Sequence, residues 1–340
     1  MKKLMIIVAT IAVLFSSAQA ADWNFYGSAR ISTFYENSDI SDSTGFDMGL
    51  QGNSRIGANV KVSDSLSGRF EYGASGGNAN IRHLYGVWNF GAGSLLVGQH
   101  DGPLRHPGSD QVYAGDAGLG GWGEMSSPRK AQLKLIIDTF RLALRDPSVD
   151  YNDGTDNVDI NTEVKIPSIE AKYRFVGDIY NLGISAGYGQ FKVGMANQET
   201  ISSYVVGIGG DLTFGGLLLG ANLFGGQNVG NLVDTDVSGT DNGAGLAVYD
   251  GTRVIDNDAL AWKIHATYIF NDMFGVQAGY GYMKTELDNQ DKDEVQSYYL
   301  QVPITLAPGL TIVPEIGTLD YMEEGQDRID YIGAKWQIDF

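Results

Sequence analysis

Five basic residues lie on the polar side of segments in which apolar and polar residues alternate. In the segment 46–62, Arg55 shares its parity with Asn53, whereas Ile56 belongs to the apolar parity. Successive side chains of a strand point to opposite faces, so such bases collect on the face that prefers water. Fixed charges along a narrow water-filled passage act on passing ions rather than on covalent bonds. The alternation places these residues on such a face: Arg55, Arg69, Lys134, Arg141 and Arg145.

The histidines and the acidic runs show no recognised metal-binding spacing. His100 and His106 flank a segment that contains Asp101, which is a weak arrangement for a metal site. The run "DTDVSG" matches the start of a calcium-binding EF-hand loop through Asp234, Asp236, Ser238 and Gly239. The twelfth position of that loop, which needs Glu for bidentate ligation, is Gly245. We expect no bound metal, because an HExxH pairing is also missing among the four histidines, His83, His100, His106 and His265.

Other classes of function are excluded by missing motifs and by charge. The glycine-rich runs "GAGSLL" and "GAGLAV" do not open a helix within a βαβ unit, so they do not indicate a nucleotide site. A G-x-S-x-G element and a Walker motif are both missing. The formal net charge of −18 argues against a nucleic-acid partner, since phosphates require a basic surface. We expect no catalytic activity, no cofactor, and no binding of DNA or RNA.

The first twenty residues have the organisation of a secretory signal peptide. Two lysines form a basic start, an apolar stretch of twelve residues covers 4–15, and small residues at 18–20 provide a cleavage site. We expect residues 1–20 to be removed and one domain to cover residues 21–340. The chain has no cysteine, so the exported protein would fold without disulfides.

The rest of the chain has the alternation expected of strands. It recurs in 180–188 and in 259–270, where Leu260, Trp262 and Ile264 oppose Lys263 and His265. The chain contains 46 Gly, 18 Tyr and 14 Phe, which suits curved sheet with aromatic surface bands. Mean hydropathy is −0.13 and the mature part has no long apolar run, so a membrane would be crossed by strands.

Fifteen connections separate these segments. Seven are tight turns, near 63–65, 91–93, 138–139, 177–178, 215–216, 271–272 and 307–309. Eight are longer and more polar, near 37–44, 75–79, 101–128, 146–167, 190–201, 227–258, 286–294 and 320–328. Short turns at one end and long loops at the other are typical of an outer-membrane barrel. We therefore predict an all-β fold, a transmembrane antiparallel β-barrel of about sixteen strands, with both chain ends on the tight-turn side.

The sequence stops on a strand pattern. In the last ten residues, "YIGAKWQIDF", Ile332, Trp336 and Phe340 share one apolar parity. The first strand, "WNFYGSARISTFYE", would pair with this segment and remove the free edges of the sheet. We expect Phe340 to face lipid at the periplasmic rim.

In their order, several motifs resemble the general bacterial trimeric porins. The resemblance covers essentially the whole mature chain and rests on "WNFYGSARIS", "VSDSLSGRFEYG", "RHLYGVWNFGAGSLLVGQHDG", "QVPITLAPGLTIVPEIG" and "GAKWQIDF". It implies a homotrimer in the outer membrane of a Gram-negative bacterium, in contact with lipid and lipopolysaccharide, that lets small hydrophilic solutes diffuse passively. It also implies that Phe340 marks the chain for the barrel assembly machinery. The hairpin "QLKLIIDTFRLALR" and the long acidic sixth loop depart from the family pattern.

The resemblance also implies where the channel is narrow. The third loop, roughly Asp101 to Ser127, would fold into the lumen opposite basic residues on strands 2, 4 and 6. The matching bases are Arg55, Arg82 and Lys134, and the candidate acidic partners on the loop are Asp110, Asp116 and Glu124. Arg82 shares its parity with Leu84 and Trp88, which leaves its direction open.

Two other classes of barrel remain open at this point. A barrel hydrolase would need a serine, a histidine and an acid together on the lipid face. A structural or adhesin-like barrel would need a filled lumen. For a channel, we expect weak ion selectivity that becomes more cation-favouring in dilute salt, because the field of acidic outer loops is screened at higher salt.

Overall fold

The computed structural model describes residues 21–40, 43–75, 78–153, 161–194, 198–235, 245–288, 290, 292–322, 325 and 327–340. The expected signal peptide, residues 1–20, lies outside the described residues, as do Asp236, Ser238 and Gly239 of the "DTDVSG" run. None of the described residues belongs to a helix long and apolar enough to cross a membrane.

Most of the described chain is β-strand. The strands are β1 (Asp22–Ser38), β2 (Ser43–Leu50), β3 (Arg55–Lys61), β4 (Leu66–Gly73), β5 (Asn80–Asn89), β6 (Ser94–His100), β7 (Lys130–Ile137), β8 (Phe140–Arg145), β9 (Asn152–Asp153), β10 (Thr162–Glu163), β11 (Ser168–Val176), β12 (Tyr180–Val193), β13 (Glu199–Phe214), β14 (Leu217–Gln227), β15 (Val248–Tyr249), β16 (Val254–Ile255), β17 (Asn257–Ile269), β18 (Gly275–Leu287), β19 (Lys292–Gln301), β20 (Ile304–Ala307), β21 (Leu310–Tyr321) and β22 (Arg328–Asp339). Two short helices, α2 (Tyr113–Asp116) and the 3₁₀ helix η2 (Val229–Asn231), lie in loops.

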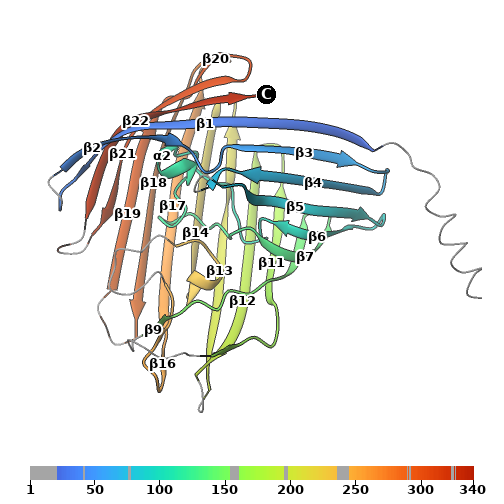
Figure 1. Ribbon diagram of the computed structural model, residues 1–340, viewed down its shortest axis with the longest axis vertical. Coiled ribbons are helices and arrows are strands. Elements are labelled where there is room, and N and C mark those ends of the chain that lie inside the picture. The colour runs from blue at the N-terminus through green and yellow to red at the C-terminus, as the bar shows by residue number, and fades with distance from the viewer. Residues whose placement is uncertain are drawn as a thin grey trace, which may run out of the picture.

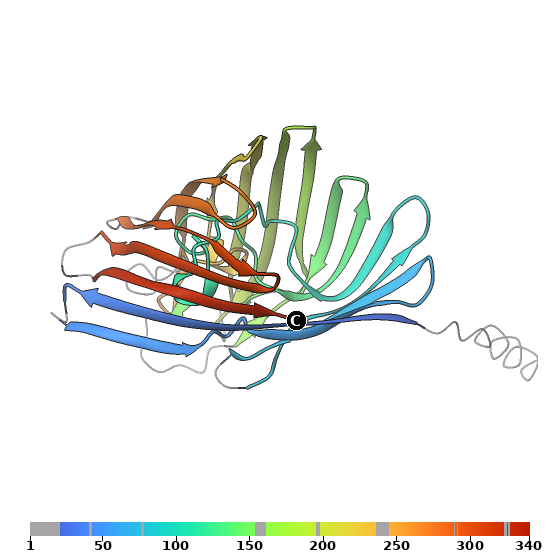
Figure 2. The ribbon, with the colours of Figure 1, turned by 90° about the horizontal axis from the view of Figure 1, so that it is seen from above.

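Nineteen strand segments form one closed antiparallel sheet (Figures 1 and 2). Three pairs of segments act as single interrupted strands, because β2 and β3 both pair with β1, β10 and β11 with β12, and β19 and β20 with β21. Nineteen segments less three interruptions give sixteen strands, which confirms the predicted number. The barrel closes where β1 pairs with β22, from Ser28 opposite Asp339 to Ser38 opposite Ile329.

The connections also fall where the sequence places them. Tight turns join β3 to β4, β5 to β6, β7 to β8, β11 to β12, β13 to β14, β17 to β18 and β20 to β21. The other eight connections are mostly longer. Two of them matter for the interior: L3, residues 101–129, joins β6 to β7, and L6, residues 228–256, joins β14 to β17.

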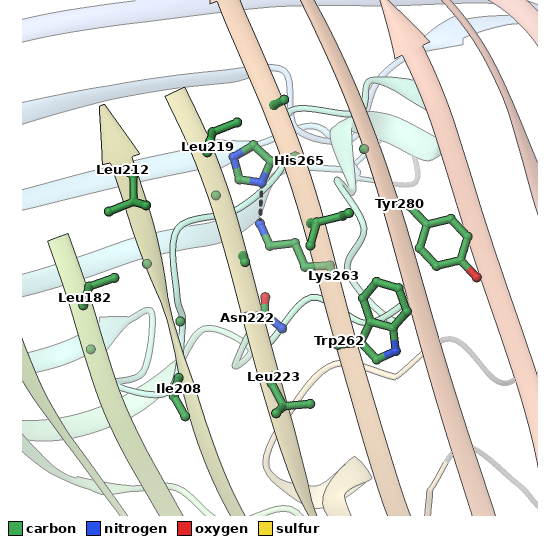
Figure 3. A pocket seen from close by; sticks show the side chains of 18 of the residues that line it. Leu182, Ile208, Leu212, Leu219, Asn222, Leu223, Trp262, Lys263, His265 and Tyr280 are labelled. Carbon is green, nitrogen blue, oxygen red and sulfur yellow. Dashed lines mark hydrogen bonds between the residues drawn. The ribbon is translucent and has the colours of Figure 1, made fainter. Parts of the chain in front are cut away.

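The outer face of the barrel is apolar and the inner face is polar. Along β17, Leu260 and Ile264 are exposed, whereas Lys263 and His265 on the other parity are buried inside. Exposed side chains of β12, β13, β14, β17 and β18 also border an apolar hollow of about 1080 Å³ (Figure 3). Such a wall suits contact with lipid chains, while closure satisfies the backbone hydrogen bonds of every strand.

Apolar side chains of L3 and L6 fill part of the interior. Tyr113 of L3 stacks on Tyr331 of β22, with ring centroids 3.9 Å apart. Leu232, next to η2 in L6, is buried in the same cluster. The barrel members of this cluster come from β1, β13, β14, β17, β18, β19, β21 and β22. L3 therefore packs against that side of the barrel, which leaves the open space toward β3–β8.

The last residue of the chain continues the sheet. The Gly27 N–H donates to the Phe340 carbonyl at 2.7 Å, and the Phe340 N–H donates to the Gly27 carbonyl at 3.0 Å. The Phe340 side chain is exposed and lies over Gly27, where a Cβ atom would come within 2.5 Å of Phe340 Cζ. A larger residue at position 27 would therefore displace the terminal ring.

Candidate functional site

Three arginines from neighbouring strands converge on one buried carboxylate, Glu71 of β4. Arg69 Nη2 lies 2.5 Å from Glu71 Oε2, and Arg82 Nε lies 2.7 Å from Oε1. Arg55 of β3 is farther away, with its Nη1 atom 3.6 Å from Oε1. The Tyr26 hydroxyl of β1 also donates to Oε2 at 2.8 Å. Because three guanidinium groups share one carboxylate, this group, the arginine wall (Arg55, Arg69 and Arg82), keeps a net positive charge beside the interior.

A β-bulge explains why Arg82 faces inward. Parity alone would place Arg82 on the outer face with Leu84. The register between β4 and β5 slips by one residue at Arg82, directly after the pair formed by Glu71 and His83. The extra residue of a bulge turns neighbouring side chains toward the same face. Arg82 and His83 therefore both point inside, which settles the direction that the sequence left open.

The tip of L3 contacts the strands at which the barrel closes. Asp116 Oδ2 lies 2.6 Å from Arg30 Nη1 of β1 and 3.2 Å from Lys335 Nζ of β22. Asn53, in the break between β2 and β3, donates its Nδ2–H to the same oxygen at 2.9 Å. Ala114 and Asp116 have φ values of 52° and 58°, a left-handed conformation that costs about 1–2 kcal/mol outside glycine. The ion pairs hold this unfavourable turn in place.

The other acidic residues of L3 are bonded to the loop itself or to the wall behind it. Glu124 accepts the Ser109 N–H at 2.7 Å, and its Oε2 atom lies 3.5 Å from Lys263 Nζ of β17. Asp110 accepts a hydrogen bond of 2.9 Å from Gln277 Nε2 of β18. Glu124 is buried, so it stabilises the fold of L3 from within.

Arg145 points inward but is covered by the end of L3. Its guanidinium group pairs with Glu170 of β11 and donates to the Pro128 carbonyl. The Arg145 and Glu170 side chains are only 2% and 1% exposed, so a solute in the lumen does not reach them. Arg145 therefore holds the C-terminal end of L3 in place, next to β7.

The open space between the arginine wall and L3 is a cavity of about 850 Å³. Seven basic side chains line it: Arg30, Arg55, Arg69, Arg82, Arg105, Arg129 and Lys335. Five acidic side chains line it: Asp101, Asp110, Asp116, Glu124 and Asp234. Each of the seven bases lies within 3.7 Å of a carboxylate oxygen. We call this cavity the main chamber.

Asp101 lies where L3 leaves β6. Its Oδ1 atom is 3.4 Å from Arg129 Nε and 3.7 Å from Arg105 Nη1. Burial alone would raise the pKa of Asp101, but the charges of Arg105 and Arg129 hold it below its usual value. Asp101 is therefore ionised at neutral pH.

Lys134 and Arg141 line a different space. Lys134 Nζ donates to the Asp101 carbonyl at 2.9 Å, and Arg141 donates to the Asp138 carbonyl at 2.6 Å in the tight turn after β7. Both border a smaller cavity of about 350 Å³ on the tight-turn side of L3. Among the bases expected from the sequence, Arg55, Arg69 and Arg82 lie together, whereas Lys134 and Arg141 form a separate group.

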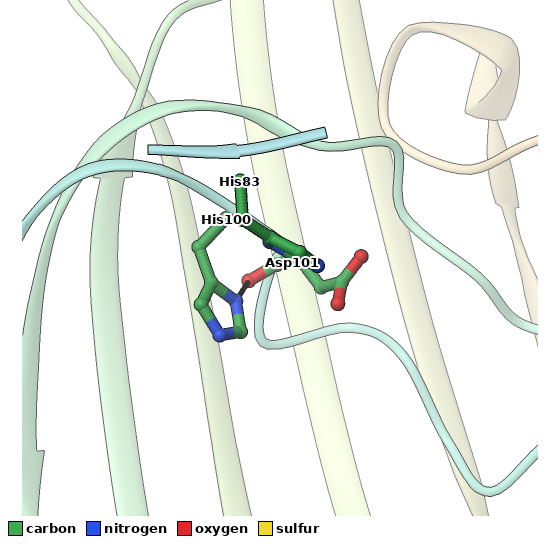
Figure 4. A group of neighbouring side chains, drawn as sticks. All are labelled: His83, His100 and Asp101. Carbon is green, nitrogen blue, oxygen red and sulfur yellow. Dashed lines mark hydrogen bonds between the residues drawn. The ribbon is translucent and has the colours of Figure 1, made fainter. Parts of the chain in front are cut away.

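The histidines bring together one group with the ligand types of a metal site. Candidate ligand atoms of His83, His100 and Asp101 all lie within 4.8 Å of one another (Figure 4). His83 was not part of the arrangement suggested by sequence, which paired His100 with His106. Arginines already pair with the Asp101 carboxylate. Lys134 Nζ also lies 3.3 Å from His100 Nδ1, so the local positive charge opposes a cation. We assign no metal to this group.

Sequence reasoning missed several residues that shape the interior. Arg30 and Lys335 hold the tip of L3, and both lie on the polar parity of their strands, which is a signal that could have revealed them. Glu71 lies two residues from Arg69 on the same parity. L6 also reaches L3, because the Asp234 N–H donates to the Ser126 carbonyl at 2.8 Å. No sequence pattern indicated that contact.

Comparison with known protein families decides the identity of the fold. A sequence model described as Gram-negative porin matches residues 8–323. The chain belongs to the Gram-negative porin family. This porin therefore forms a water-filled channel for the passive diffusion of small hydrophilic solutes across the outer membrane. A comparison with curated proteins gave no significant match.

Solved structures with the same fold include several outer-membrane channels. The porin resembles the outer membrane channel DcaP of Acinetobacter baumannii with a TM-score of 0.75 and 18% identity, over 96% of this chain and 99% of that one. It resembles the anion-selective porin from Comamonas acidovorans with a TM-score of 0.59 and 12% identity, over 94% and 100% of the two chains. The trimer form of OmpT of Vibrio cholerae gives a TM-score of 0.57 and 19% identity, over 94% and 100%. At these identities the likeness is one of fold.

Proposed function

We propose that solutes pass through the main chamber, and that the channel is narrowest between the arginine wall and the tip of L3. The main support is the set of fixed charges that lines this space: the arginine wall (Arg55, Arg69 and Arg82), and Asp116 of L3 with its partners Arg30 and Lys335. Fixed charges that line a narrow polar passage select solutes by charge. The unfilled volume of about 850 Å³ supports a channel over an adhesin-like barrel with a filled lumen.

The balance of charge in the main chamber favours weak selectivity. Seven lining bases face five lining acids. The buried partners Glu71 and Lys263 bring these counts to eight bases and six acids, so two positive charges remain. The whole chain carries −18, and its acidic outer loops act at the mouth of the channel. A Debye length of about 8 Å at physiological salt screens the mouth more than the interior. We expect a slight preference for anions at high salt that shifts toward cations in dilute salt.

Reversal potentials of the purified protein in planar bilayers test this proposal. Replacing the two more exposed wall bases, Arg55→Gln with Arg69→Gln, should move selectivity toward cations at all salt concentrations. The matched control is Lys284→Gln with Lys292→Gln, which removes two bases from the region around the β18–β19 loop. The control variant should change the ion selectivity only in dilute salt. Equal effects of the two double variants at high salt would refute the position of the narrow section.

We also propose that the protein has no catalytic site. All four histidines of the chain lie among the described residues, and all of them face the interior or L3, not lipid. His106 Nε2 lies 2.9 Å from Ser185 Oγ, but Lys172 occupies the position near Nδ1 where a hydrolase needs an acid. Burial, with Lys172 adding to it, lowers the pKa of His106 to about 3. A phospholipid hydrolysis assay should show no activity above that of the Ser185→Ala variant.

The remaining features of the proposal concern export and assembly. We propose that residues 1–20 are removed as a signal peptide and that both ends of the mature chain are periplasmic. We propose contacts with lipid and lipopolysaccharide, recognition of Phe340 by the barrel assembly machinery, and a homotrimer. The trimer form of OmpT, which shares the fold, supports the last point. Native mass measurement in detergent should give three chains per particle, and a monomer would refute it.

A further inference from the structure

A second chamber lies on the tight-turn side of L3. It has a volume of about 350 Å³, and the described residues that line it include five cationic side chains and a single carboxylate, that of Asp101. The cationic residues are Arg105, Lys134, Arg141, Lys172 and Arg174. Since a water molecule takes roughly 30 Å³ in the liquid, the space holds a small solute with part of its hydration shell.

Four of these bases differ from those of the main chamber in having no counter-charge. Every base of the main chamber lies within 3.7 Å of a carboxylate oxygen. Among the described residues, no carboxylate lies within 4.0 Å of the amino or guanidinium groups of Lys134, Arg141, Lys172 and Arg174. The lone lining acid, Asp101, is already paired with Arg105 and Arg129. The chamber therefore carries a concentrated positive charge.

Backbone atoms of L3 hold two of these amines in place. Lys134 Nζ donates to the Asp101 carbonyl at 2.9 Å, and Lys172 Nζ donates to the Arg105 carbonyl at 2.6 Å. Both side chains are less than a tenth exposed, so they cannot swing into bulk water. Carbonyl dipoles satisfy hydrogen bonds without cancelling a full charge.

The carboxylate of Asp211, farther away, is bonded to an asparagine rather than to one of these bases. Asp211 of β13 accepts a hydrogen bond from Asn181 Nδ2 at 3.4 Å, and Asn181 Oδ1 accepts one from Arg174 Nε at 2.9 Å. Asn181 thus lies between the base and the acid. Gly183 and Gly209 leave the wall of the chamber bare, and a Cβ atom at Gly183 would come within 2.9 Å of Lys172 Cε.

We infer that this second chamber is a binding subsite for small, multiply charged oxyanions, with inorganic phosphate as the simplest probe. Four unpaired bases around one space repel each other, and an oxyanion relieves that repulsion while accepting their N–H groups. The subsite rests on the proposed function, because a solute reaches it only through the channel. An anion leaving the main chamber past Asp101 and Arg105, which border both spaces, enters it directly.

Chloride current through single channels tests the subsite, with phosphate added to either side of the bilayer. Phosphate should reduce the current saturably, because an occupied subsite obstructs the path. In the variant Lys172→Gln with Arg174→Gln, the phosphate concentration for half inhibition should rise at least about tenfold, since two charges are lost close to the anion. The charge-preserving variant Lys172→Arg with Arg174→Lys should stay close to the wild type, which controls for misfolding.

The variant Lys284→Gln with Lys292→Gln provides a second control, because it removes the same charge outside the chamber. It should leave the half-inhibitory concentration within about twofold of the wild type. A wild-type current that phosphate does not reduce would overturn the subsite and leave the channel proposal intact. The subsite would also be overturned if phosphate inhibited the wild type and the variant Lys172→Gln with Arg174→Gln at the same concentration. If the wild-type protein conducts no current before phosphate is added, that result would instead count against the proposed function.

Discussion

Replacing Glu71 with glutamine is the sharpest single change to the arginine wall. The Glu71 side chain is fully buried and accepts from Arg69, Arg82 and Tyr26, with Arg55 slightly farther away. Glutamine keeps the shape and one acceptor oxygen but removes the negative charge. The net charge of the wall therefore rises from +2, for three bases and one acid, to +3.

The size of the effect follows from Coulomb's law. One added charge about 6 Å from a passing ion contributes roughly 0.7 kcal/mol at the dielectric constant of water. An anion gains this energy and a cation loses it, so their relative free energy changes by about 1.4 kcal/mol, or about tenfold in relative occupancy. At an ionic strength where the Debye length is about 10 Å, screening reduces this free-energy difference by roughly half. We expect the anion-to-cation permeability ratio of Glu71→Gln to rise about threefold to tenfold.

Reversal potentials across a KCl gradient measure this ratio in planar bilayers. Glu286→Gln is the matched control, since it removes one negative charge from a partly exposed pair with Lys284 at the end of β18 next to the β18–β19 loop. Its effect should disappear in strong salt, where the Debye length is about 3 Å, while the effect of Glu71→Gln persists. An unchanged ratio in a normally folded Glu71→Gln protein would show that the arginine wall does not line the conducting path.

Three further perturbations address the loop and the barrel. Deleting Phe340 should lower the yield of assembled, heat-modifiable barrel, because it removes the terminal sheet contact and the proposed assembly mark; unchanged yield would contradict both roles. Arg145→Met leaves Glu170 buried without its counter-charge and should cost about 3–5 kcal/mol in the free energy of unfolding. Replacing Glu170 by Leu in the same chain should recover most of that loss in denaturant titrations, and no recovery would contradict the assigned pairing. Asp116→Asn should loosen the tip of L3 and add rapid current fluctuations, so a quiet record would show that the ion pairs do not hold it.

Strand topology could be predicted because local sequence patterns determine it. Alternation with a period of two and the contrast between tight turns and polar loops gave sixteen strands, with β1 paired to β22. These signals depend on each residue and its neighbours in sequence, and lipid outside with water inside enforces them along every strand.

The positions of the site side chains could not be predicted in detail, because they depend on structural features that leave no pattern in the neighbouring sequence. The bulge at Arg82 reverses the parity on which a sequence argument relies. Arg145 has the correct parity for the lumen, but L3 covers it through Pro128, a contact that only the folded loop creates. The division of bases between two chambers likewise follows from the path of L3, which places Lys134 against the Asp101 carbonyl.

We propose that solutes pass along the arginine wall, and the lack of cysteine in the chain allows a direct measurement of this path. A single cysteine is introduced by Arg69→Cys, and a bulky charged thiol reagent is added while channel current is recorded. The reagent should reduce the current irreversibly in Arg69→Cys but not in Ile264→Cys, which lies on the exposed outer face of β17. A current that the reagent leaves unchanged in Arg69→Cys, with the modification verified by mass, would contradict a conducting path beside Glu71 and its arginines.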